Sequence, residues 1–406
     1  GDEPTVVGQG QATFRVVADG VTIRGFDLTS ANDDDNPIGV IVDDADGVTI
    51  EKNSIRDLAG SSSMPPVAAA QAVLVIENEG SPISDATVKD NVVDNVTDPR
   101  SVSGIRYNGD VRGAIEGNNI SNLRTGNGFT QAIALAEGGG GSAGPSDVDI
   151  SGNDVSLLEP GATGPQPFTS HVDLGQNTTD ITVTGNSFSE ERDEEVFVAD
   201  LSGSLDIAQV LSDNDYENGA ASLDAVDPQA FPAPTRIPSG AQGIGPSLSQ
   251  VVSVAGDAST VTAAEGTYRE QVAVEKALTI RGQGDSTVIE SPDTPDVVGG
   301  LDGRDVRTPF FVNETTDIEV TDLKVDGRNV AAGGDAFFGM YVLDSSGMIS
   351  DVTVTNATQG SDSSPSGNQF VDGIRVRNAG SDALSFSVVD STVKNFDKRG
   401  IRAGNA

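Results

Sequence analysis

A short phrase that recurs along the first half of the chain constrains its fold more than any other feature. The phrase reads apolar, any residue, apolar, two further residues, asparagine, any residue, apolar. The asparagines at its centre are Asn53, Asn91, Asn118, Asn153, Asn186 and Asn214, which are 38, 27, 35, 33 and 28 residues apart. A period of roughly thirty residues with variable insertions predicts that each repeat is one supersecondary unit stacked on the next.

The asparagine must lie at a bend of each repeat. The apolar residues two before and two after it cannot both face a core across a flat strand unless the chain turns between them. Asparagine tolerates the left-handed conformation, and its amide can hydrogen-bond the backbone or its own copy in the neighbouring repeat. We therefore expect the six asparagines to form a structural ladder and not a ligand site.

The charge of the chain is extreme. Aspartate accounts for 44 and glutamate for 18 of the acidic residues, lysine occurs only 6 times, and the net charge is −38. This excess of short carboxylates resembles the proteins of salt-loving archaea, because molar salt shortens the Debye length to about 3 Å and screens the self-repulsion. Such a polyanion is not expected to bind nucleic acid.

The absence of cysteine excludes a disulfide framework and any thiol chemistry. No run of apolar residues is long enough for a membrane span and no signal peptide begins at Gly1, so we expect a soluble mature or excised segment. Glycosylation sequons occur at Asn95, Asn119, Asn177, Asn313 and Asn356. Together with the acidity they favour an extracellular, glycosylated surface protein.

The stretch from Ala263 to Glu290 predicts two short strands, with Val272 and Val274 in the first and Leu278 and Ile280 in the second. Its sequence Gly266-Thr-Tyr-Arg-Glu270, followed by Leu-Thr-Ile-Arg-Gly, resembles the first coil of proteins of the pectin lyase-like superfamily. The resemblance implies an all-β fold, a right-handed parallel β-helix solenoid.

The sequence beyond Glu290 copies the first half of the chain at an offset of roughly 300 residues, a tandem duplication of a repeat module. Gly39-Val-Ile-Val corresponds to Gly339-Met-Tyr-Val, and the apolar positions from Phe14 to Leu28 correspond to those from Phe311 to Val325. We predict a first module over residues 1–217, a proline- and glycine-rich linker or cap over 218–246, and a second module over 247–406. Residues from Ser247 onward could form a short amphipathic helix or strand that caps the second module.

Both ends of the chain are expected to lie within a coil. The simplest interpretation is a segment of a longer, multi-module protein; the alternative is a subunit whose open coils meet end to end in a fibre. Self-association or contact with neighbouring modules is therefore the predicted partnership.

The enzymes of the superfamily offer motifs to test. Gly266-Thr-Tyr268-Arg-Glu270 and Gln71-Ala-Val73 match two pectin methylesterase motifs but in the wrong order, and the three catalytic motifs are missing. The single histidine, His171, does not lie in the Gly-His-Gly of the galacturonan hydrolases, and we expect it at the surface or a coil edge. No catalytic residue is predicted.

A calcium site is the remaining chemical candidate. Asp33, Asp34 and Asp35 lie in an insertion, and Asp43 and Asp44 follow at the next corner. Clustered carboxylates are what a hard cation binds, although no cofactor is required by the sequence and solvated acidic loops are the competing interpretation.

Two functions are left open. The first is a non-catalytic structural or adhesive module of a halophilic archaeal surface protein, used as a stalk, fibre or array. The second is a polysaccharide-active enzyme, of lyase or glycoside hydrolase type, with a site in acidic loops or near His171. Binding of surface glycans without turnover is disfavoured, because only 4% of the residues are aromatic.

Overall fold

The computed structural model describes residues 5–8, 12–30, 37–60, 70–78, 80–126, 128–138, 143–156, 158–159, 168–189, 195–216, 220–223, 242–245, 247–330, 335–358, 370–380 and 384–405. These residues form short strands joined by turns, with the brief helices α1 (Ile207–Asp213) and α2 (Leu248–Val254), so the all-β prediction is confirmed. Within these ranges no helix is long and apolar enough to cross a membrane.

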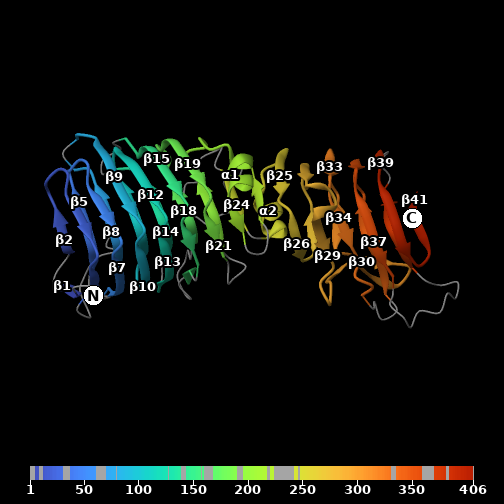
Figure 1. Cartoon of the computed structure of the whole chain (residues 1–406). Coiled ribbons are helices and arrows are strands. Elements are labelled where there is room, and N and C mark those ends of the chain that lie inside the picture. Colours follow the sequence, from blue (N-terminus) through green and yellow to red (C-terminus); the bar gives the residue numbers. More distant parts are fainter. Residues whose placement is uncertain are drawn as a thin grey trace. The chain divides into compact units, whose positions relative to one another are not determined.

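The chain divides into two compact units; in the sequence colours of Figure 1, most of unit 1 is blue to green and most of unit 2 is yellow to red. Unit 1 comprises Gly1–Glu217 and Pro234–Pro246, and unit 2 comprises Asn218–Ala233 and Ser247–Ala406. The boundaries predicted for the two modules and the segment between them stay a prediction.

Unit 1 contains three sheets in which neighbouring strands run parallel. Sheet A holds β1 (Thr5–Gly8), β4 (Asp27–Ser30), β7 (Ser54–Ala59), β10 (Val92–Asp98), β13 (Asn119–Thr125), β16 (Asp154–Val155), β20 (Ser187–Phe188) and β22 (Asp215–Tyr216), and β17 (Leu158–Glu159) also pairs with β13. Sheet B holds β2 (Ala12–Val16), β5 (Ile38–Asp43), β8 (Ala70–Ile76), β11 (Val102–Asn108), β14 (Phe129–Ala136), β18 (Phe168–Leu174) and β21 (Glu195–Asp200). Sheet C holds β3 (Thr22–Arg24), β6 (Thr49–Glu51), β9 (Ile83–Lys89), β12 (Val111–Glu116), β15 (Ser146–Ser151) and β19 (Thr179–Thr184).

The chain visits sheets B, C and A in turn, and each strand pairs with its counterpart one repeat away. The register aligns the buried residue of one repeat with that of the next, as in the row Val40, Val73, Ile105, Ile133 and Val172 of sheet B. All five side chains are fully buried. The repeated apolar phrase thus forms one continuous core, because equivalent side chains stack directly upon one another.

The sequence suggests a left-handed backbone conformation for the asparagine at each bend, and the structure differs. The left-handed residue is the one before the asparagine, namely Lys52, Asp90, Gly117, Gly152 and Gly185, with φ between 54° and 63°. The asparagines themselves have negative φ, and their side chains turn inward. Glycine adopts this conformation without steric cost, which explains why three of the five positions carry it.

The last repeat of unit 1 departs from the sequence prediction. Leu211 is the apolar position three residues before Asn214 in the repeated phrase, and the repeat therefore predicts a strand there. It lies instead in α1, where it is buried with Val210. The Asp206 side chain accepts a hydrogen bond from the Gln209 backbone N–H and so caps the helix. The short strand β24 (Gln242–Gly245), from the second segment of unit 1, pairs antiparallel with β21.

Unit 2 follows the same path through three sets of parallel strands, here called sheets D, E and F. Sheet D holds β25 (Ser259–Ala263), β28 (Leu278–Arg281), β33 (Ile318–Thr321), β36 (Gly347–Ser350) and β39 (Phe386–Val389), with β23 (Ala221–Leu223) antiparallel to β25. Sheet E holds β26 (Gly266–Arg269), β29 (Thr287–Glu290), β34 (Lys324–Asp326), β37 (Thr353–Ala357) and β40 (Thr392–Phe396), and the 3-10 turn η1 (Gly284–Ser286) precedes β29. Sheet F holds β27 (Val272–Val274), β32 (Phe310–Asn313), β35 (Ala336–Leu343), β38 (Val371–Asn378) and β41 (Arg399–Asn405).

The strands predicted around Val272 and Leu278 are confirmed as β27 and β28. The Gly-Thr-Tyr-Arg-Glu sequence before them has a structural role. Tyr268 is buried and donates hydrogen bonds to the carbonyls of Ala220 (2.5 Å) and Ala264 (3.1 Å). The Glu270 carboxylate accepts from the Leu248 and Ser249 backbone N–H groups at 2.8 and 3.1 Å, at the start of α2. The motif therefore anchors the helix that begins unit 2, as a coil-opening sequence would.

An antiparallel hairpin extends sheet F, because its second strand pairs parallel with the N-terminal end of β35. Strands β30 (Val297–Leu301) and β31 (Arg304–Arg307) form it, and their apolar residues pack with Phe311, Phe338 and Tyr341.

The predicted equivalence of Phe14 and Phe311 is wrong by one residue. Phe14 pairs with Val40 and Phe310 with Met340, so Phe310 fills the inner core and Phe311 faces outward.

Candidate functional site

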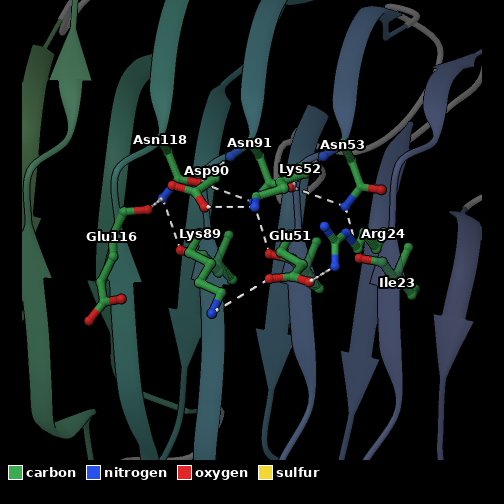
Figure 2. A network of polar contacts seen from close by, with 12 residues as sticks. Ile23, Arg24, Glu51, Lys52, Asn53, Lys89, Asp90, Asn91, Glu116 and Asn118 are labelled. Atoms are coloured by element: carbon green, nitrogen blue, oxygen red, sulfur yellow. Dashed lines mark hydrogen bonds and ion pairs between the residues drawn. The ribbon is translucent and has the colours of Figure 1, made fainter. Parts of the chain in front are cut away.

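The six repeated asparagines are joined by hydrogen bonds along unit 1, and Figure 2 shows the part from Asn53 to Asn118. The Asn53 backbone N–H and side-chain Nδ2 both donate to Asn91 Oδ1, each at 3.0 Å. The same pair of bonds links every later asparagine to the next, ending at Asn214. The oxygens of the later five asparagines accept from the preceding copy, and Asn53 Oδ1 accepts from the Phe26 backbone N–H at 3.0 Å. These side chains therefore hold repeats together and are not a ligand site.

Charged side chains of sheet C run beside the ladder (Figure 2). Glu51 lies between Arg24 at 3.3 Å and Lys89 at 3.5 Å; the Arg24 side chain is largely exposed and that of Lys89 partly so. Exposed pairs of this kind contribute little, about 0 to 1 kcal/mol each. We interpret these charged side chains of sheet C as a solvated face of the sheet and not as a binding site.

The predicted calcium ligands are only partly described. Asp33, Asp34 and Asp35 lie outside the described residues. The Asp43 carboxylate accepts from Arg15 Nε at 2.9 Å and from Asn78 Nδ2 at 2.7 Å, and Asp44 Oδ1 accepts from the Asn78 backbone N–H at 2.6 Å. The Arg15 hydrogen bond holds the pKa of Asp43 below its usual range. Among the described residues no three carboxylate or imidazole side chains cluster as metal ligands would, and calcium binding stays a prediction.

His171 was expected at the surface or a coil edge, and this is wrong. Its side chain is 0% exposed, and its ring lies 5.6 Å from that of Phe188 and 5.1 Å from that of Phe197. It occupies the inward position that carries Ala72, Gly104 and Ala132 in the preceding repeats. Its Nε2 lies 3.2 Å from the Ser189 carbonyl, so the imidazole belongs to an aromatic core and is out of reach of a substrate.

The predicted glycosylation sites differ in accessibility. Asn95, Asn119 and Asn177 are exposed, whereas Asn313 and Asn356 are half-buried. The Asn95 and Asn356 amides donate to Asp57 (2.6 Å) and Asp326 (2.9 Å) respectively. Asn119 and Asn177 are therefore the sequons best placed to carry a glycan.

A polar group that the sequence analysis did not identify lies on the outer face of sheet B. The register places Arg106, Ala134 and Asp173 in one row on β11, β14 and β18. Their neighbours Ile105, Ile133 and Val172 face the core, so this row points away from it. Gln131, three residues before Ala134, donates a hydrogen bond from Nε2 to Asp173 Oδ2.

Burial changes the pKa values of Asp173 and Arg106. Burial raises the pKa of Asp173 to about 6, although the Gln131 hydrogen bond and the Arg106 charge both act to lower it. Burial also lowers the pKa of Arg106, against the opposing effect of Asp173. A carboxyl group with a pKa near neutrality can exchange protons at working pH, and a guanidinium on the same face can neutralise an anionic substrate group.

The surroundings of this group are polar as well. Gln71, Ser103, Gln131 and Ser170 form a second row, one per strand from β8 to β18. Ser103 Oγ donates to Gln131 Oε1 at 3.4 Å, whereas the structure shows no hydrogen-bond partner for the buried Ser170 hydroxyl among the described residues. Buried polar groups usually have partners, so Ser170 is an exception among the described residues.

No protein-family model and no curated protein matches the chain. Among solved structures, it is similar to a mutant of the PL6 family alginate lyase AlyGC, with 10% identity and a TM-score of 0.26 over 95% of this chain and 77% of that one. It is also similar to the A-module of the Azotobacter vinelandii mannuronan C-5 epimerase AlgE4, with 9% identity and a TM-score of 0.18 over 99% and 88% of the two chains. A third similarity, to the Dettilon tailspike protein, has 10% identity and a TM-score of 0.19 over 93% and 61%. Similarity at this level says nothing about the activity of this chain.

Proposed function

We propose that each unit is a right-handed parallel β-helix, and that unit 1 acts on an acidic polysaccharide along the outer face of sheet B. The ordered visits of the chain to three parallel sheets support a solenoid. Its expected hand is right, because the connection between two parallel strands of one sheet is nearly always right-handed. The observation that carries the activity is the placement of Arg106 and Asp173 in one outward row of sheet B, with the Asp173 carboxylate held by Gln131. Burial raises the pKa of Asp173 to about 6, which suits a proton-transfer role.

The reaction that suits these residues is proton transfer at the carbon next to a uronate carboxylate. The Asp173 carboxylate would act as the general base, since a base with a pKa near the working pH combines availability with driving force. Arg106 would bind the substrate carboxylate and stabilise the negative charge that develops on it. Gln131 is a positioning residue, because its Nε2–H holds the Asp173 carboxylate in place.

Arg106 and Asp173 face the same side of sheet B. Arg106 and Asp173 are two strands apart in the row, and only the methyl group of Ala134 lies between them. At about 4.8 Å per strand their backbones are roughly 10 Å apart. Elimination and epimerisation both begin with this proton abstraction, and the later steps separate them.

Incubation with alginate, polygalacturonate and other uronate polymers in D2O tests the proposal. Unsaturated ends, seen by ultraviolet absorbance, report elimination, and deuterium at the acidic carbon, seen by NMR, reports epimerisation. Asp173→Asn should abolish turnover, and Arg106→Gln should lower kcat/KM by at least about tenfold, corresponding to 1.4 kcal/mol. The control Asp154→Asn removes an exposed carboxylate of unit 1 and should retain full activity. Full activity of Asp173→Asn would contradict the proposed role.

A structural or adhesive function is the second candidate, and it has its own observation. Strands β39, β40 and β41 expose Val389, Phe396 and Ile401, which are 42%, 37% and 48% accessible. Exposed strands with apolar side chains favour association with another chain, and the partner proposed here is a second copy of this chain. Sedimentation would show association of the wild-type chain that Ile401→Asp reduces; a monomer at all concentrations would speak against a fibre.

The proposed setting is extracellular, at high salt. The net charge of −38 and the exposed sequons at Asn119 and Asn177 support it. Mass spectrometry of peptides from the native source would detect glycans at these two asparagines. Unmodified peptides at both positions would remove the glycoprotein part of the proposal.

A further inference from the structure

Unit 2 gathers positive charge on one face, in a chain with 62 acidic and 24 basic residues. Arg375 and Arg377 lie on β38, and Arg399 and Arg402 lie on β41, the neighbouring strand of sheet F. The register sets Asp372 beside Arg399 and Arg375 beside Arg402. Like charges on adjacent strands repel, so their juxtaposition calls for a counter-charge.

The carboxylate at the centre of this group is a poor counter-ion for it. Asp372 lies 3.7 Å from Arg375 Nη1 and 3.7 Å from Arg399 Nη1, both longer than a hydrogen bond. Burial raises the pKa of Asp372, although Arg375, Arg399, Arg402 and Lys398 all act to lower it. A single carboxylate, 3.7 Å from its two arginine partners, thus faces four cations.

Arg375 is the most constrained of the cations. Its side chain is 4% exposed, and within the described part of the chain the structure shows no hydrogen-bond acceptor for its Nε and Nη1. Burial and the nearby Arg402 charge lower the pKa of Arg375. A buried guanidinium without acceptors is costly unless an anion binds it.

The surroundings would strengthen such binding. Tyr341 lies beside Arg375 in the register and belongs to the outer aromatic cluster with Phe311 and Phe338. An apolar wall lowers the local dielectric constant, so a charge-assisted hydrogen bond here is stronger than in water.

We propose that this group is an oxyanion-binding site, taking a carboxylate, sulfate or phosphate group. Arg375 offers two unpartnered donors, Nε and Nη1, on different edges of its guanidinium, and Arg399 and Arg402 add charge from β41. The anion is either a free inorganic ion or a group carried by a saccharide. The site lies in unit 2 and does not depend on the activity proposed for unit 1.

Calorimetric titration of the full chain with inorganic sulfate tests the proposal, with sodium chloride adjusted to constant ionic strength. Saturable binding of one sulfate per chain is expected. Arg402→Gln, a half-buried residue on β41, should weaken it by about tenfold or more, equivalent to 1.4 kcal/mol. Asp372→Asn should tighten it, because it removes the competing negative charge. A loss of structure would weaken binding in both variants, so the opposite signs identify the site.

Arg281→Gln is the matched control, since Arg281 is an exposed arginine on sheet D of the same unit. It should leave the affinity unchanged. A parallel titration with a sulfated and a uronate oligosaccharide separates the sources: tighter binding of an oligosaccharide than of sulfate indicates a saccharide-borne group. Absence of saturable binding to sulfate and both oligosaccharides, or equal weakening by Arg281→Gln, would overturn the proposal.

Discussion

At the scale of single residues, Asn118 shows what the ladder contributes to stability. Its Oδ1 accepts from the Asn91 N–H and Nδ2, and its Nδ2 donates to the Val88 carbonyl at 2.9 Å. Asn118→Ala leaves buried donors of Asn91 without an acceptor, so we expect the free energy of unfolding to fall by about 2 to 3 kcal/mol. Urea denaturation followed by circular dichroism measures it. Asn119→Ala, at the adjacent exposed position, should change it by less than about 0.5 kcal/mol.

Asp173 should make stability depend on pH. The folded carboxyl has a pKa of about 6 against an ordinary value of 3.8, so between these values the folded state binds more protons than the unfolded state. The free energy of unfolding therefore falls as pH rises through this window, and above it the ionised carboxylate costs at most about 3 kcal/mol.

Asp173→Asn removes this cost and keeps an acceptor for Gln131. Relative to wild type, the variant should be more stable at about pH 7.5 than at about pH 3.5, where both side chains are neutral. Denaturant titrations at the two pH values compare them, with Asp154→Asn as the exposed control. An equal difference in stability at both pH values would contradict the raised pKa. A catalytic carboxyl that destabilises its own fold would fit the trade-off between activity and stability.

At the scale of elements, the start of unit 2 depends on one carboxylate. Glu270 accepts from two backbone N–H groups at the N-terminus of α2 and from Ser247 Oγ at 2.6 Å. Glu270→Gln removes the charge that the helix N-terminus favours and should destabilise unit 2 by about 1 to 2 kcal/mol. Hydrogen exchange would show faster exchange in α2 and β25. Glu275→Gln, on an exposed side chain nearby, should have no such effect.

Elements also show where sequence patterns mislead. The alternation that places Val172 inside correctly predicts a strand, but it does not say that the inward His171 is enclosed by aromatic rings from other repeats. In the same way, the phrase around Asn214 predicts a strand at Leu211 because its apolar spacing matches earlier repeats. The chain forms α1 there instead, and only the asparagine keeps its place in the ladder.

At the scale of the whole molecule, charge governs the conditions under which the chain folds. A net charge of −38 opposes a compact state, and salt screens it. Raising sodium chloride from about 0.1 M to about 2 M shortens the Debye length from about 10 Å to under about 3 Å, so the unfolding temperature should rise with salt. Scanning calorimetry at several salt concentrations measures this, and an unfolding temperature that is independent of salt would contradict it.

The sequence alone determined the strand pattern, the position of the asparagine ladder and the acidic surface, because alternation, repeat spacing and composition are local properties. It did not bring Arg106, Gln131 and Asp173 together, nor Asp372 and Arg375 with Arg399. These residues come from different repeats, and each looks like an ordinary outward position in its own strand. Their meeting depends on the register between stacked strands, and only the tertiary structure decides that register because insertions of variable length separate one repeat from the next.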